Sequence, residues 1–208
     1  MKTYLLKLLV IIAAFAPSSL PAQVNLVYNG SFEIDNSFSG WTWVSGDLFM
    51  PGAPGSGIQC ADGHNAIGLR WQATIYQDVV TVVGQQYDFS FYLAAAGANG
   101  VPMNVVYLNP SFGSTSLGTL SFSGAGKSYQ NMGWEKFDYV ETATSTSSRI
   151  TFFNPSVSSS DPSWPMVDNV WLTAVPEPSV TALLFWGGVL LLSRCRLTRP
   201  VIPTTGSV

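Results

Sequence analysis

Short runs in which apolar and polar residues alternate constrain the fold of this chain more than any other feature. In the run 87–93, Phe89 and Phe91 alternate with Asp88 and Ser90. A period of two places the apolar side chains on one face of a β-strand. Similar runs lie around residues 137–139, 150–152 and 170–172, and further strand candidates are 75–83, 101–108 and 117–122. The pattern predicts an all-β protein.

Turn-forming residues separate these runs, at 51–55, 97–100, 109–110 and 158–162. Glycine, proline, asparagine and serine supply the backbone conformations that tight turns need. No stretch of a dozen residues shows the 3.6-residue apolar period of a helix. Many short strands joined by such turns predict an all-β sandwich. In a jelly roll, strands that begin and end the body can lie side by side.

Residues 1–22 have the features of a signal peptide. Lys2 and Lys7 provide positive charge, residues 5–16 are otherwise apolar, and small Ala22 marks the expected cleavage point. The apolar run is too short to span a membrane comfortably. We therefore expect this segment to direct export and to be removed, and an uncleaved anchor helix is the alternative.

The C-terminal segment, residues 175–208, combines a proline motif, an apolar stretch and a basic cluster. The two prolines of the motif interrupt regular structure, and residues 180–192 are uncharged and mostly apolar. Thirteen residues make about 20 Å of helix, which is marginal against a hydrocarbon core of about 30 Å. The motif is Val175, Pro176, Glu177 and Pro178, and the basic residues include Arg194 and Arg196.

This arrangement resembles the PEP-CTERM sorting signal of exported Gram-negative proteins. The resemblance implies transient insertion of residues 180–192 into the inner membrane and recognition there by an exosortase, a membrane cysteine protease. The protein would then reach the cell envelope or the extracellular matrix. One departure is that the chain continues from Pro200 to Val208, beyond the basic cluster where the signal usually stops.

The body between these ends, residues 23–174, has the length of one domain. All twelve acidic residues of the chain lie within 23–179, where only four basic residues occur, so this region carries a net charge of −8. Such a charge disfavours nucleic acid as a partner and discourages binding to anionic membranes. Cys60 is the body's cysteine, and it is either a small buried residue or a thiol for intermolecular pairing.

Several segments follow one another along the body in a recognisable order. They are NLVYNGSFE at 25–33, GW at 40–41, DGHNAIGL at 62–69, IYQDV at 75–79, GQQYDFSF at 84–91 and MVDNV at 166–170. This order resembles the galactose-binding-like jelly rolls, which include carbohydrate-binding modules and related cell-wall domains of unknown function. The resemblance implies the fold more securely than any ligand.

In the resembled modules, the acids at the positions of Glu33 and Asp168 help to hold a structural calcium ion. The resemblance therefore implies a calcium site here, completed by further oxygen ligands from neighbouring loops. The alternative is that Glu33 caps a turn and Asp168 is a solvated acid at a strand end.

Six tryptophans in the body offer rings on which sugars could stack, although most of them are expected to fill the core. Trp41 follows a turn and Trp164 lies between two prolines, so these two are predicted to bind ligand at the surface. The single histidine, His64, is expected in an exposed turn, because no nucleophile motif accompanies it.

Together these features predict an exported, non-enzymatic envelope or matrix protein that binds neutral glycans or extracellular polysaccharide. One alternative is a purely structural surface protein without a defined ligand. The other is a glycoside hydrolase that uses a pair of carboxylates.

Overall fold

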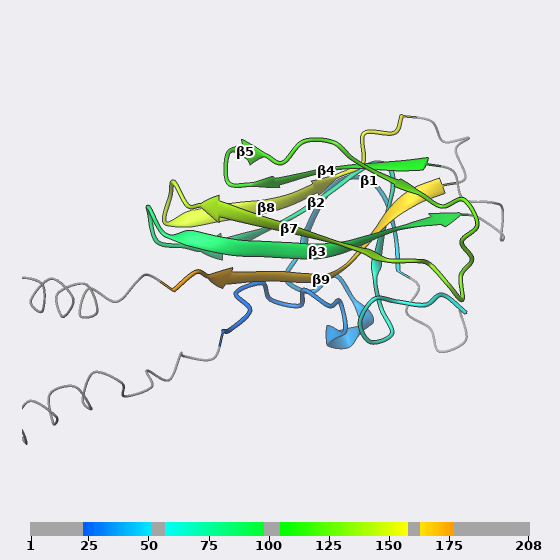
Figure 1. The fold of residues 1–208 in the computed structure, drawn as a ribbon, viewed down its shortest axis with the longest axis horizontal. Coiled ribbons are helices and arrows are strands. Elements are labelled where there is room, and N and C mark those ends of the chain that lie inside the picture. Colours follow the sequence, from blue (N-terminus) through cyan, green and yellow to red (C-terminus); the bar gives the residue numbers. More distant parts are fainter. Residues whose placement is uncertain (1–22, 51–56, 98–104, 158–162, 177–208) are drawn as a thin grey trace, which may run out of the picture. The chain divides into compact units, whose positions relative to one another are not determined.

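The computed structural model describes residues 23–50, 57–97, 105–157 and 163–176 (Figure 1). The predicted signal peptide lies outside these residues, as do the expected turns at 51–55 and 158–162 and the part of the predicted sorting segment beyond Pro176. The strands all belong to the unit that ends at Ala174. Within the described residues, no helix is long and apolar enough to cross a membrane.

The described part is built from antiparallel strands and one short 3-10 turn, η1 (Ile34–Asn36). The strand order is β5-β4-β8-β2-β9-β3-β7, with β1 paired to β2 and β6 paired to β4. This confirms the all-β prediction, while assignment to a galactose-binding-like jelly roll stays a prediction. The strands are β1 (Thr42–Phe49), β2 (Ile67–Val80), β3 (Gln86–Gly97), β4 (Val105–Phe112), β5 (Thr115–Ser116), β6 (Leu120–Ser123), β7 (Glu135–Thr142), β8 (Ser147–Phe153) and β9 (Ser163–Ala174).

Strand β2 changes partners along its length, and this folds the sheet over on itself. Its first residues pair with β9, whereas the segment from Thr74 to Val80 pairs with β8. Between these parts, Trp71 and Gln72 have φ of 22° and 54°, a left-handed conformation that non-glycine residues rarely adopt. This interruption of the regular strand geometry lets β2 pair with β9 in one layer and with β8 in the other.

Aromatic side chains fill the space between the two layers. Phe91 of β3 meets Phe152 of β8 edge-on, with ring centroids 4.9 Å apart, and Phe89 lies 6.2 Å from Phe112 of β4. These rings are fully or almost fully buried. The alternation in residues 87–93 is thus confirmed as an inward apolar face, and it leaves the residues between them on the outer face of β3.

The beginning and the end of the body lie side by side, as the sequence predicted. The amide of Leu26 donates to the carbonyl of Leu172 at 2.8 Å, and the amide of Val170 donates to the carbonyl of Gly30 at 2.8 Å. This pairing brings the segment that contains Glu33 close to the strand that contains Asp168.

The expected turn at 109–110 is wrong, because both residues lie inside β4. Pro110 is opposite Phe152 of β8. On its other edge, β4 pairs with β6 up to Leu108 and with β5 from Ser111. Proline is tolerated where a ladder changes partners, since its missing N–H removes no essential hydrogen bond there.

Candidate functional site

A groove of about 540 Å³ lies on the outer face of the layer formed by β7, β3 and β9. Most of its residues are those that the inward apolar alternation leaves pointing outward, and Gln23 joins them from the N-terminal segment. The strand residues are Asp88, Ser90 and Tyr92 of β3, Lys136, Asp138, Tyr139 and Val140 of β7, and Asn169, Trp171 and Thr173 of β9.

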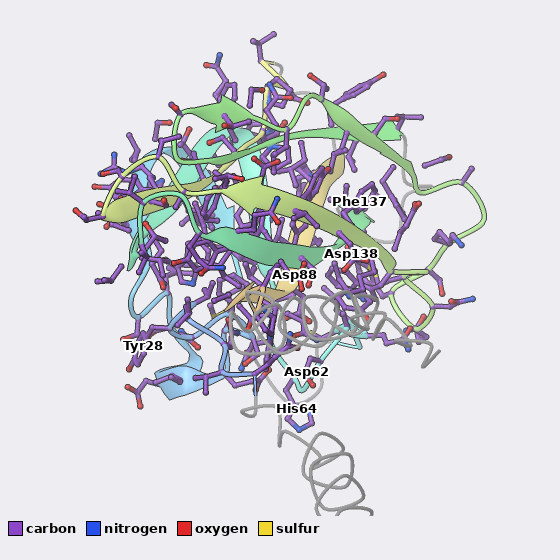
Figure 2. The ribbon with its side chains drawn as sticks, turned by 60° about the vertical axis from the view of Figure 1, so that its left-hand side comes forward. Tyr28, Asp62, His64, Asp88, Phe137 and Asp138 are labelled. Carbon is purple, nitrogen blue, oxygen red and sulfur yellow. The ribbon has the colours of Figure 1, made fainter. Side chains whose placement is uncertain are left out.

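Strand register arranges these side chains in rows across the groove. Ser90 lies between Trp171 and Asp138, and the neighbouring row has Asp88 at its centre. Figure 2 shows Asp88 and Asp138 on neighbouring strands. The indole of Trp171 is 38% exposed, so the groove combines an accessible aromatic ring with hydroxyl, amide and carboxylate groups.

Charge in the groove is mostly negative. Lys136 and Asp138 form an ion pair within β7, with the Asp138 side chain 63% exposed. Asp88 adds a second carboxylate to the lining. The groove therefore holds two acids and one base.

A bulge in β9 sets the orientation of Trp171. The register between β3 and β9 shifts between Ser90 and Tyr92, and Asn169 adopts a φ of 47° at this point. Bulges place an extra residue in one strand and redirect the side chains around it. Here the bulge puts Trp171 beside Ser90 and Asp168 beside Tyr92.

The carboxylate of Asp168 holds the loop that follows Ile58. Its Oδ2 accepts hydrogen bonds from the amides of Ala61 at 2.8 Å and Asp62 at 2.9 Å, and its Oδ1 accepts one from the amide of Asn169 at 2.6 Å. The side chain is fully buried. Burial raises the pKa of Asp168 to about 7, although the three amide hydrogen bonds oppose this shift. The alternative prediction of a solvated acid is wrong for this residue.

Glu33 holds the next part of the same loop. Its Oε1 accepts from the amides of His64 at 2.7 Å and Asn65 at 2.6 Å, and its Oε2 accepts from the Asn65 side chain at 3.0 Å. Gly63 has a φ of 60°, and a Cβ there would lie 2.5 Å from Glu33 Oε1. Glycine is required at this position, both for the backbone conformation and for the close approach of the carboxylate.

These contacts fit capping rather than calcium ligation. Calcium needs six to eight oxygen ligands, but amide N–H donors face the oxygens of both Glu33 and Asp168. Within the described ranges, no three His, Cys, Asp or Glu side chains are grouped to hold a metal ion. The calcium role stays a prediction that the present geometry does not support.

The capped loop borders a second hollow, of about 270 Å³, at the end of the groove. Tyr92 lines both hollows, and Cys60 and Trp134 also line the second. Burial, followed by the charges of Asp168 and Glu33, raises the pKa of the Cys60 thiol to about 12. A thiol with so high a pKa is protonated and unreactive at neutral pH, which favours the interpretation of Cys60 as a structural residue.

Trp41 is not a surface residue, which corrects the predicted exposure. It is 7% exposed, and its ring centroid lies 5.6 Å from that of Phe32 and 5.9 Å from that of Phe152. Its indole N–H donates to the Asn29 carbonyl at 3.1 Å. The turn before Trp41 directs the ring inward, so it packs the N-terminal segment onto the core.

The predicted exposure of Trp164 is wrong as well. The residue is 5% exposed, with the Phe49 ring 5.8 Å away edge-on and the Arg70 guanidinium 4.3 Å above its ring. Trp164 is the second residue of β9, opposite Ala96, rather than part of a loop between two prolines. His64, by contrast, is exposed as expected, and Figure 2 shows it in the same loop as Asp62.

The sequence itself indicated that Trp171 is exposed, but the interpretation based on neighbouring turns and prolines did not consider this residue. Successive residues of a strand point to opposite faces. Val170 and Leu172 are apolar and lie on the buried face, so Trp171 between them must point outward. An outward tryptophan flanked by Asn169 and Thr173 on one strand face is a better surface candidate than a tryptophan after a turn.

The chain matches the DUF642 family, described as a protein of unknown function, over residues 25–173. It belongs to this family. None of the curated proteins compared with the chain matches it.

Solved structures similar to this DUF642 protein include several carbohydrate-binding modules. TmCBM61 in complex with β-1,4-galactotriose is 18% identical, with 73% of this chain and 99% of that chain covered and a TM-score of 0.48. A family 16 module is 19% identical, with 72% and 99% covered and a TM-score of 0.47. The CBM22 tandem of Paenibacillus barcinonensis Xyn10C is 14% identical, with 78% and 48% covered and a TM-score of 0.49.

Proposed function

We propose that this DUF642 protein is an exported, non-enzymatic envelope or matrix protein that binds neutral glycans in the groove on β3, β7 and β9. The exposed ring of Trp171 beside Ser90 is the observation that carries the proposal. Sugar rings present apolar C–H faces that stack on aromatic side chains, while neighbouring polar groups bind their hydroxyls.

The charges of the groove favour neutral over acidic glycans. Asp88 and Asp138 outnumber Lys136, and Lys136 is already paired with Asp138. A uronate would meet like charges in the groove and in the region 23–179, whose net charge is −8. A neutral sugar needs only hydrogen bonds, which carboxylates readily accept.

Tyr92 supports an extended ligand, because it lines both the groove and the second hollow. A linear glycan could continue from Trp171 past Tyr92 toward Trp134. The surface is shallow, so the cost of immobilising the ligand keeps the affinity roughly micromolar to millimolar.

The test compares two exposed tryptophans. Trp171→Ala should abolish retention on immobilised neutral polysaccharides, whereas Trp43→Ala should leave it unchanged. Trp43 is 59% exposed on β1 and lies outside the groove, so it controls for the loss of any surface indole. Equal retention of both variants would contradict this assignment of the site, and no retention of the unaltered chain on any neutral glycan would favour the structural alternative.

The hydrolase alternative can be examined in the same samples. Asp88 and Asp138 form the carboxylate pair of the groove, but Asp138 is open to solvent and paired with Lys136. A general acid needs a desolvated site that keeps it protonated. We therefore expect no release of reducing ends from polysaccharides that the protein retains, and turnover lost in Asp88→Asn would reverse this conclusion.

Export and sorting form the second part of the proposal. Residues 1–22 would direct export, and the tail would insert residues 180–192 transiently in the inner membrane for an exosortase. Mass spectrometry of the mature protein from its native host should find no residues beyond about Ser179. Pro176→Ala combined with Pro178→Ala should retain the precursor in the membrane fraction, and an intact Cys195 in the mature protein would contradict this sorting route.

A further inference from the structure

Three strongly exposed valines lie where β2 turns into β3. Val80, Val82 and Val83 are 83%, 65% and 59% exposed. Single exposed apolar residues are common, but turns are usually built from polar residues. A cluster of three on one turn therefore indicates a surface with an apolar partner.

This turn is ordered by contacts with the turn between β7 and β8. The amide of Thr81 donates to the carbonyl of Thr146 at 3.0 Å, and the amide of Gly84 donates to the carbonyl of Ala143 at 2.8 Å. The two turns, residues 79–87 and 142–148, form one end of the body, which we call the valine end (Figure 1).

The valine end carries no charged residue, although the body as a whole is strongly acidic. Residues 79–87, 142–148 and 169–176 contain no Asp, Glu, Lys or Arg. Nearby, Asp78 and Arg149 neutralise each other through two hydrogen bonds of 2.8 Å. Valine, threonine and serine make up most of this end. Glu141, opposite Tyr87, borders this end, but an anionic lipid surface would still repel the uncharged turns less than it repels the acidic groove.

The chain leaves the body at this same end. Ala174, the last residue of β9, is opposite Tyr87 in the register of β3 and β9. Only five residues, 175–179, separate it from the apolar segment 180–192. Five residues span at most about 17 Å when fully extended. A bilayer that held the apolar segment would therefore lie close to the valine end.

We propose that the valine end is a membrane-contact surface that lies against the lipid headgroups while the C-terminal segment is inserted. This inference rests on the proposed insertion of residues 180–192. The valines enter the boundary between headgroups and acyl chains, where small apolar side chains are favourable, and the hydroxyl groups around them bind headgroups and water. The strands then stand away from the membrane, and the groove on the side of β3, β7 and β9 stays open to glycans.

The experiment uses the full chain with Cys195→Ser, reconstituted into vesicles of phosphatidylcholine and phosphatidylglycerol. A polarity-sensitive fluorophore is attached at Val82→Cys or, in a second variant, at Val80→Cys. The matched control is Ala125→Cys, an exposed residue after β6. Ala125 lies at the opposite end of β4 from the valine end. Ser123, just before it, is opposite Val105 at the start of β4, whereas Phe112 at the end of β4 is opposite Ile150 of β8. Cys60 remains, and a chain without an added cysteine measures any labelling of it.

We expect a blue-shifted emission for the labels at 80 and 82, with quenching by nitroxide lipids at least threefold stronger than for the label at 125. If the chain floats with the vesicles but the labels at both ends are quenched equally, the membrane contact of the valine end is overturned, whereas the insertion of residues 180–192 is not. Failure of the chain to float overturns both. A blue shift that depends on protein concentration and is insensitive to nitroxide lipids would show contact between two copies instead, and would also overturn the proposal.

Discussion

The two halves of β9 use tryptophan in different ways. In the first half, Trp164 and Asp168 are buried, and neither side chain is accessible to a ligand. In the second half, Trp171 is exposed in the groove. The halves meet at the bulge around Asn169. The comparison shows that the role of a tryptophan or an acid in this strand depends on the segments that cover it. Here those segments are β1 and the loop after Ile58.

The largest expected difference between the halves is in stability. Trp164→Ala should lower the free energy of unfolding by about 3–5 kcal/mol, because it leaves a cavity beside Phe49 and removes the ring under Arg70. Trp171→Ala should cost less, about 1 kcal/mol, since Trp171 is partly exposed and lines the groove. Urea unfolding of the body, residues 23–174, measures both. Similar losses in the two variants would remove the distinction between the halves.

The buried acid of the first half should make stability depend on pH. The pKa of Asp168 is raised from 3.8 to about 7 in the folded state, so folding favours its protonated form. Its contribution is fully present below about pH 4 and is lost as the pH rises toward 7, a change of the order of a few kcal/mol. Unfolding free energies measured from pH 4 to 8 should fall across this window in the unaltered body.

The control for this pH effect is the same measurement on two variants. Asp168→Asn should flatten the profile, because no group titrates at that position. Asp138→Asn should keep the slope, since Asp138 is exposed in the groove. A slope that survives Asp168→Asn would assign the dependence to another group.

Removing the second cap of the loop should have a smaller effect. Glu33→Ala leaves the amides of His64 and Asn65 without their acceptor, which should cost about 1–3 kcal/mol. Because the loop also borders the second hollow, glycan affinity should weaken too. Thermal melts with and without a chelator extend the test to calcium. An unchanged curve leaves capping as the role of Glu33, and a chelator-dependent shift that disappears in Glu33→Ala would restore the calcium prediction.

The smallest expected effect on stability lies in the groove. Asp138→Asn removes an exposed ion pair with Lys136, and such pairs contribute less than about 1 kcal/mol. Neutral-glycan binding should change by only a few-fold, while retention on acidic polysaccharides should rise at low ionic strength. Affinity electrophoresis in gels with either polysaccharide measures both. A rise in binding to both kinds of gel would contradict a charge-based preference.

Local patterns predicted the strands well, but they could not predict the site. The alternation in residues 87–93 and 170–172 identified β3 and β9 and the parity of their buried faces. Strand β1 was not expected, because its residues are mostly exposed and its register to β2 is irregular. The first interpretation of Trp41 and Trp164 failed because it relied on neighbouring turns and prolines, whereas burial depends on segments far away in the chain.

By itself, the sequence determined the all-β class, the acidic charge of the body and the uncharged stretches of the valine end, because each follows from composition or from a period of two residues. Only the tertiary structure decided which tryptophan is accessible and what Asp168 does. Asp168 meets Ala61, more than 100 residues earlier in the chain, and its burial follows from that contact. Such contacts depend on register, on the bulge near Asn169 and on the break in β2, which no local pattern specifies.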